Sequence, residues 1–302
     1  MLPLRIAGWA RACRHALSLA ATLAAGLLGA SEPAAEAPLT WPAGDGWLLT
    51  LEPDRPEVYP RYLADPRRPR MAVGLLFAGE SQVPASGDSR FALDHGARAP
   101  LVGLERTDGS RRWRLYAEAG FFGQFDRLNS LDEIGWDGWY ALYAGVDLHG
   151  PWRARFGLRH LSAHLGDELV LRTGRERIDY TREDAFLGLA WVGSPVTLYL
   201  DGGYAPERNL PTQRPLVVQA GAQHERPRAW GPIGWYAGVD AKAFEEDDFE
   251  PALAAELGLA LPIRGSGAVW RLAAEGYAGR AILGEFSRLE EDWVAVSLGV
   301  DF

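Results

Sequence analysis

The sequence contains one cysteine, Cys13, and two methionines among its 302 residues. Cys13 lies in an N-terminal segment that we predict to be removed, and it lacks the lipobox setting of a lipoprotein, so the mature chain is expected to have no disulfide. After Ala30 there is no run of about 20 apolar residues, which excludes transmembrane helices. The chain also lacks a phosphate-binding loop, a dinucleotide glycine fingerprint, a His-Glu-x-x-His motif and a cysteine pair.

Basic residues are in the minority, with 31 Lys and Arg against 40 Asp and Glu, which gives a formal charge of −9. Three of the arginines precede an Ala/Leu-rich run over residues 16–28; they are Arg5, Arg11 and Arg14. Leu28-Gly29-Ala30 then offers a small-residue cleavage site, so residues 1–30 are predicted to be a secretory signal peptide. Its removal takes the charge from −9 to −12, which argues against a nucleic-acid partner.

The C-terminal strand is the most informative segment that is present. Its apolar residues alternate with small or polar ones up to the end of the chain: Val294, Val296, Leu298, Val300 and Phe302. An apolar strand that ends on an aromatic residue is typical of the closing strand of a Gram-negative outer-membrane β-barrel, and barrel-assembly machinery is the partner expected to recognise Phe302. The 12 Trp, 10 Tyr and 35 Gly agree with aromatic girdles and tilted strands.

Period-two alternation predicts an all-β, transmembrane, antiparallel up-and-down barrel of about 12 strands over residues 70–302. The strands are expected near residues 70–78, 98–106, 111–122, 138–148, 151–163, 178–192, 195–204, 215–225, 232–244, 252–263, 268–278 and 292–302. Short and long connections alternate, which predicts that both termini lie in the periplasm. The irregular, proline-rich residues 31–69 are predicted to be a pre-barrel periplasmic segment or a plug.

Charged residues occupy one face of the predicted strands, because a charge on the lipid face costs about 2–4 kcal/mol at mid-membrane. The expected lumen-lining residues are Arg112, Arg114, Glu118, Asp147, Arg153, Arg155, Arg159, Asp201, Asp240, Lys242, Glu256, Arg271 and Glu275. Both signs occur, so these groups either pair and fill the lumen or line a narrow solute pore.

The strand over residues 151–163 carries polar groups on its lipid-facing row, which continues as His160, Ser162 and His164. A hydroxyl beside an imidazole is the beginning of an activated serine, and a carboxylate would complete it. Glu183 or Asp179 on the next strand is expected to lie within a few residues of the pair. The candidate catalytic residues are therefore Ser162, His160 and Glu183; the alternative is a polar rim in the headgroup zone.

This layout resembles that of outer-membrane phospholipase A and of the small lipid A deacylase, which carry a His-x-Ser pair on the outside of a barrel. The match is His160-x-Ser162, and the Asn-Gly that usually follows the serine is replaced by Ala163-His164. The resemblance implies lipid-ester hydrolysis, with calcium as a possible cofactor. His164, Asp167 and Glu168 are candidate metal ligands, and the acidic run at residues 245–250 offers a second cation-binding loop; in both places a solvated loop is the alternative.

Several segments together resemble a bacterial outer-membrane barrel family known as domain of unknown function 1207. They are the sequences at residues 63–67, 160–168 and 240–251, in the expected order. The resemblance implies an outer-membrane location and no established activity.

Three function classes therefore stay open at this point. The first is a non-enzymatic outer-membrane barrel, structural or forming a narrow solute pore. The second is a lipid-ester hydrolase, and the third is a surface receptor or adhesin that uses its acidic loops. The sequence favours the first, with outer-membrane lipids and lipopolysaccharide as surrounding partners. The predicted loops are short for a receptor, which lowers the third.

Overall fold

The computed structural model describes residues 39–51, 57–264 and 266–302. The predicted signal peptide and its cleavage site lie outside the described residues. None of the helices in this described part is long and apolar enough to cross a membrane.

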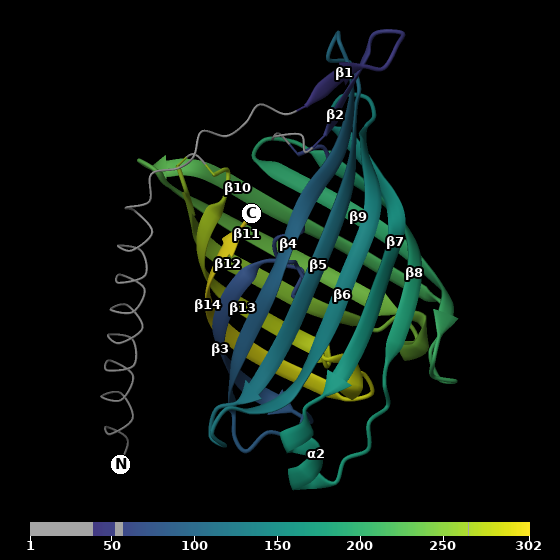
Figure 1. The fold of residues 1–302 in the computed structure, drawn as a ribbon. Helices are drawn as coiled ribbons and strands as arrows, with labels where there is room; N and C mark the ends of the chain where they lie inside the picture. The colour runs from purple at the N-terminus through teal and green to yellow at the C-terminus, as the bar shows by residue number, and fades with distance from the viewer. Residues whose placement is uncertain (1–38, 52–56, 265) are drawn as a thin grey trace. The chain divides into compact units, whose positions relative to one another are not determined.

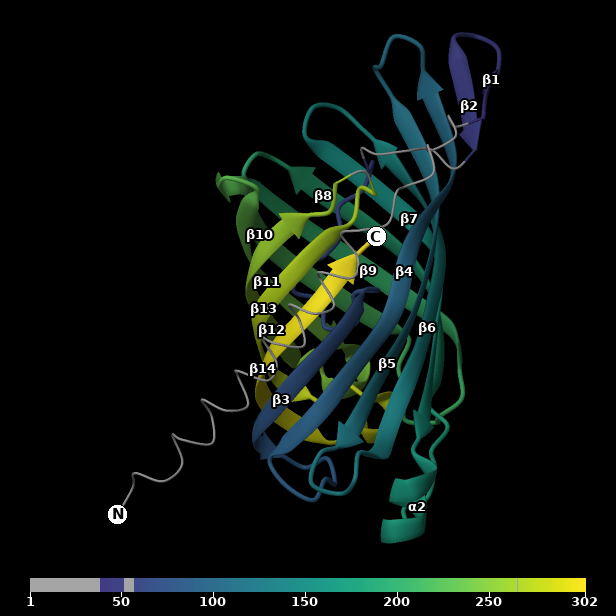
Figure 2. The ribbon, with the colours of Figure 1, turned by 60° about the vertical axis from the view of Figure 1, so that its left-hand side comes forward.

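Twelve antiparallel strands close into a barrel (Figures 1 and 2), which confirms the predicted fold class. The barrel closes because β4 pairs with both β3 and β5, while β14 pairs with β3. The strands are β3 (Met71–Ser81), β4 (Ser89–Arg106), β5 (Arg112–Asp126), β6 (Asp132–Asp147), β7 (Trp152–Leu165), β8 (Thr181–Val192), β9 (Val196–Arg208), β10 (Leu216–Trp230), β11 (Ile233–Phe244), β12 (Pro251–Pro262), β13 (Val269–Arg280) and β14 (Glu290–Asp301).

The two faces of the wall follow the alternation of the sequence. Leu158, Leu187 and Leu257 are 60–66% exposed on the outer surface. Their neighbours along each strand point inward and are largely buried or half-buried. An apolar outer surface and a polar interior are what a bilayer requires of a spanning barrel.

Two features of the N-terminal part differ from the prediction. The second barrel strand was expected at residues 98–106 but begins at Ser89. Its first half was not predicted because the inward Arg90 and Asp94 give it the composition of a loop. A hairpin of β1 (Thr40–Pro42) and β2 (Trp47–Leu51) was not expected. β2 pairs with residues 102–106 of β4 and extends the sheet beyond β3.

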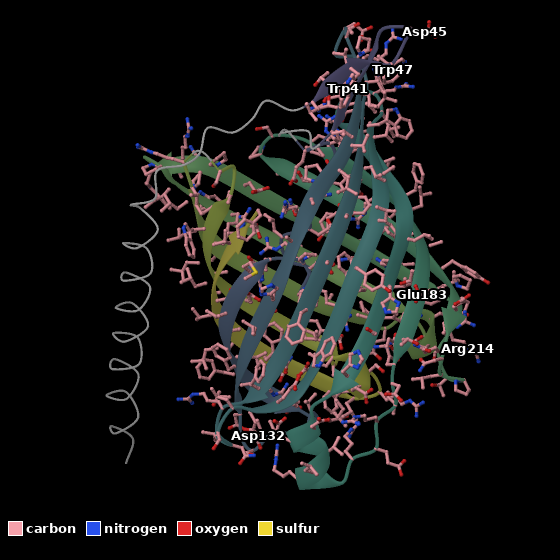
Figure 3. The ribbon with its side chains drawn as sticks, viewed as in Figure 1. Trp41, Asp45, Trp47, Asp132, Glu183 and Arg214 are labelled. Carbon is pink, nitrogen blue, oxygen red and sulfur yellow. The ribbon has the colours of Figure 1, made fainter. Side chains whose placement is uncertain are left out.

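The barrel has two distinguishable ends. The hairpin end carries β1 and β2 with Trp41 and Trp47, while the α2 end carries the short helix α2 (Asp167–Thr173) and Asp132 (Figure 3). Two single-turn helices, η1 (Glu245–Asp247) and η2 (Gly284–Phe286), also lie in loops. The loops at the α2 end span residues 82–88, 127–131, 166–180, 209–215, 245–250 and 281–289.

Residues 57–70, which we call the inner segment, lie inside the barrel. Tyr59 and Leu63 are 0% and 2% exposed, and the Leu63 N–H donates to Gln223 Oε1 on β10 (3.0 Å). Ion pairs join this segment to inward side chains of several strands: Asp65–Lys242, Arg67–Asp137, Arg68–Glu256, Arg68–Asp301, Arg70–Asp94 and Arg70–Glu275. The segment therefore occupies the lumen and is bonded to most sides of the wall.

A second insertion enters from the α2 end. Residues 281–289, the inward loop, bury Leu283 and Phe286 against Ile134, Leu165 and Leu169. A hydrophobic cluster at this position excludes water from the mouth of the barrel. The inward loop thereby covers the α2 end of the lumen.

The two insertions meet at one carboxylate. Asp137 on β6 is fully buried and accepts hydrogen bonds from Arg67 Nη2 (2.7 Å) and from the Gly284 N–H (3.0 Å). Arg67 Nη2 also donates to the Ile282 carbonyl of the inward loop. Since both insertions are bonded to the same buried group, they meet inside the barrel at Asp137.

Candidate functional site

The outer face of β7 carries the candidate catalytic pair near the α2 end of the barrel. Trp152, Phe156 and Leu158 are exposed on this face, and the same row continues as His160, Ser162 and His164. The intervening arginines point inward. The strand geometry therefore places an imidazole and a hydroxyl on the surface that the bilayer covers.

The structure brings His160 and Glu183 together. The two residues are direct cross-strand partners on β7 and β8, and His160 Nδ1 is hydrogen-bonded to Glu183 Oε1. The imidazole also stacks on the exposed Tyr140 of β6, with ring centroids 4.5 Å apart. These contacts on both sides hold the ring, and they leave Nε2 as the nitrogen for proton transfer (Glu183 is labelled in Figure 3).

Ser162 lies two residues beyond His160 on the same face, half-buried and directly opposite Thr181 of β8. Among the residues that the structure describes, its hydroxyl has no hydrogen-bond partner, and none joins it to His160. Catalytic hydrogen bonds in unliganded enzymes are often long and tighten with substrate. The hydroxyl is thus not held by a hydrogen bond to a described residue.

Gly138 gives the hydroxyl its space. It is the cross-strand partner of Ser162 on β6, and a Cβ at this position would lie 3.3 Å from Ser162 Oγ and 3.2 Å from the Trp136 ring. The missing side chain leaves a notch beside the hydroxyl. We did not single out Gly138 or Tyr140 from the sequence, and only the register of the neighbouring strand identifies them.

The structure does not assemble the three candidate metal ligands into a site. His164 is exposed and stacks on Trp136 (centroids 4.0 Å apart), while Asp167 pairs with Arg177 and Glu168 is exposed in α2. Within residues 39–51, 57–264 and 266–302, no cluster of three or more His, Cys, Asp or Glu side chains could hold a metal ion. Asp179, the other candidate orienter, precedes β8, and its N–H donates to Glu285 (2.7 Å).

The predicted lumen-lining residues point inward, and most of them pair. Arg155 pairs with Asp201, and Arg159 with Asp184, which also accepts from Arg182. Further contacts include Arg112–Asp147, Arg153–Asp147, Arg114–Glu105, Arg98–Glu118, Tyr143–Glu118, Gln219–Asp240, Lys242–Asp65, Arg271–Asp301, Arg68–Glu256 and Arg70–Glu275. Buried charges require such partners because an unpaired one costs several kcal/mol.

The chain belongs to the family described as a protein of unknown function, DUF1207, whose model matches residues 44–302. No curated protein matches the sequence.

Solved structures with the same fold include outer membrane phospholipase A from Escherichia coli, with a TM-score of 0.53 and 14% sequence identity. The match covers 78% of this chain and 94% of that one. The Salmonella typhi enzyme, solved as a dimer with bound calcium, has a TM-score of 0.54 and 13% identity over 78% of this chain and 91% of that one. At these identities the likeness establishes a shared barrel fold.

Proposed function

We propose that this member of the family is an outer-membrane lipid acyl hydrolase with Ser162 as nucleophile, His160 as general base and Glu183 as the group that orients the imidazole. The observation that carries the proposal is the hydrogen bond between His160 and Glu183 on the lipid-facing surface, with a free hydroxyl two residues away. A carboxylate, an imidazole and a hydroxyl in this order are the parts of an activated serine.

The chemistry follows from the placement of the protons. Glu183 accepts the Nδ1 proton of His160, so that Nε2 is unprotonated and can take the proton from Ser162 Oγ as this oxygen attacks the ester carbonyl. The ester C–O bond then breaks, and Nε2 returns the proton to the leaving alcohol. Water repeats the cycle on the acyl-serine and releases a fatty acid. His164, two residues beyond Ser162 in the same row, is the group we propose as donor to the oxyanion.

Location on the outer face favours a membrane lipid as the substrate. A lipid in the bilayer presents its ester bonds close to the headgroups, and Ser162 is three residues from the α2 end of β7. The apolar side chains Leu158 and Leu142 continue along the wall toward mid-membrane, where acyl chains lie. We propose that the α2 end faces the outside and the termini face the periplasm, with lipopolysaccharide and outer-membrane phospholipids as the candidate substrates.

The interior supports this assignment over the solute-pore alternative. The inner segment and the inward loop meet at Asp137, and the charged groups of the lumen are largely paired with one another. A path for solutes would require one of these insertions to leave. The wall instead provides a rigid frame for a site on its outer surface.

The test is release of fatty acid from phospholipid and lipopolysaccharide vesicles by the refolded barrel, with calcium or with a chelator. Ser162→Ala should abolish the release, whereas Thr181→Ala, a matched hydroxyl directly across the strand pair, should retain it. Because one of the neighbouring enzymes was solved with bound calcium, both conditions are needed. Equal release by the parent and Ser162→Ala, or no release by the parent under either condition, would overturn the proposal.

A further inference from the structure

A cavity of about 70 Å³ lies between the inner segment and the wall, on the inner side of β7 and β8. This volume is several times what one buried water needs, so the space admits a small ion. Eight of its nineteen lining residues are Arg or Lys, and three are Asp or Glu. The surface of the cavity is therefore strongly cationic.

The positive surface arises from the way the ion pairs are oriented. Three of the lining arginines pair with carboxylates outside the cavity. Arg155 pairs with Asp201, Arg67 with Asp137, and Arg98 Nη1 with Glu57. None of these three carboxylates lines the cavity. Three other carboxylates do line it: Glu118 pairs with Arg98, Asp184 with Arg159 and Arg182, and Asp65 with Lys242. The lining cations still outnumber the lining carboxylates eight to three.

Arg98, one of the lining residues, has a side-chain donor without a partner. It is 4% exposed, donates from Nη1 to Glu57 (3.1 Å), forms an ion pair through Nε with Glu118 (3.0 Å), and lies 4.3 Å above the ring of Tyr116. Its Nη2 is buried and has no hydrogen-bond partner among the described residues. A buried guanidinium donor without a partner is costly, and an anion in the cavity would satisfy it.

We infer that this cavity is a binding site for a small tetrahedral oxyanion of the phosphate class. Guanidinium forks match the oxygen pairs of such anions and bind them in a bidentate manner. Arg67 and Arg68 belong to the inner segment, whereas Arg98, Arg155 and Arg159 belong to the wall. A bound oxyanion therefore bridges the two and stabilises the filled lumen. The site is separate from the lipid-facing residues, and its test does not depend on hydrolysis.

Two variants remove lining cations while leaving each carboxylate with another partner. In Arg98→Gln, Glu57 keeps Arg61 and Glu118 keeps the Tyr143 hydroxyl. In Arg159→Gln, Asp184 keeps Arg182. The matched control is Arg112→Gln, an inward arginine outside the cavity; its partner Asp147 keeps Arg153.

The measurements are calorimetric titration of inorganic phosphate into the full refolded barrel at pH 7, and the thermal midpoint in phosphate against chloride at equal ionic strength. The parent and Arg112→Gln should bind phosphate with affinities within twofold of each other and gain stability from it. The two cavity variants should bind at least tenfold more weakly. If neither refolds, the titration of the parent decides. No heat and no stabilisation in the parent, or equal weakening in all three variants, would overturn the inference.

Discussion

The two faces of β7 carry polar side chains under opposite conditions. On the inner face, Arg153, Arg155 and Arg159 each pair with a carboxylate. On the outer face, Ser162 has no hydrogen-bond partner within the described part of the chain. Stability explains the first arrangement, because buried charges without partners are costly. It does not explain the second, since an apolar residue at this position would suit lipid better.

This difference fits the proposal that the inner face is organised for stability and the outer patch for chemistry. A polar residue in a lipid-facing row is a functional candidate because the membrane penalises it. Substitutions on the two faces test this contrast. Outer substitutions should change activity and leave the free energy of unfolding unchanged, whereas inner substitutions should change the free energy of unfolding and leave activity unchanged.

The largest effect is expected for His160→Ala. Loss of the general base should lower the rate of fatty-acid release by about 10³–10⁴-fold, or about 4–5 kcal/mol in the barrier. Unfolding in lipid vesicles should change by less than about 0.5 kcal/mol, since the site is at the surface. Rates measured beside Tyr140→Ala, which removes the stacked ring but keeps His160, separate loss of the base from loss of packing. A stability loss as large as the activity loss would place His160 in the structural framework.

Asp137→Ala should have the next largest effect, on stability. It leaves Arg67 and the Gly284 N–H without their acceptor, and breaking a buried ion pair costs about 3–5 kcal/mol. Denaturant unfolding of the refolded barrel measures the cost. Asp147→Ala is the control, because its arginine partners at the hairpin end are more exposed. Equal costs in the two variants would contradict the role of Asp137 as the junction of the two insertions.

Glu183→Gln should have an intermediate effect on activity alone. The amide can still contact the imidazole but cannot stabilise its protonated form, so the rate should fall by about 10–100-fold. Glu207→Gln, the cross-strand neighbour on β9, is the matched control. An unchanged rate in Glu183→Gln would remove it from the site.

The smallest effect concerns pH and the inner segment. Burial raises the pKa of Asp65, but Lys242 and the hydrogen bonds from Gln219 and the Arg67 N–H outweigh it and hold this pKa well below its ordinary value. The contribution of Asp65 to stability is therefore complete above its ordinary pKa and is lost as the pH falls below about 4. Thermal midpoints between pH 5 and pH 3 should fall further in the parent than in Asp65→Asn. Parallel curves would refute this contribution.

The sequence predicted the barrel because period-two alternation repeats in several strands. The first half of β4 was not predicted, because Arg90 pairs with a residue on β14 and Asp94 pairs with a residue of the inner segment. The partner of Arg90 is about 200 residues away in the sequence and that of Asp94 is 24 residues away, so no local pattern reveals them. The same reason hid the inward loop, whose contact with Asp137 spans 147 residues.

The candidate site was predictable in part. The row of His160 and Ser162 follows from the face of one strand, and Glu183 was expected within a few residues. Their contact depends on the register of β7 with β8, which the loop containing α2 determines. Gly138 could not be identified, because a glycine in a strand has many uses and only the neighbouring strand places it beside Ser162.

The most direct test of the catalytic assignment is covalent labelling of the refolded barrel with a fluorophosphonate that carries a long alkyl chain, followed by peptide mass spectrometry. Phosphonylation requires an activated serine, since the probe reacts slowly with ordinary hydroxyls. We expect a stoichiometric adduct on Ser162 in the parent and in Thr181→Ala, and none in His160→Ala. An unlabelled parent, or equal labelling of Ser162 with and without His160, would contradict the account.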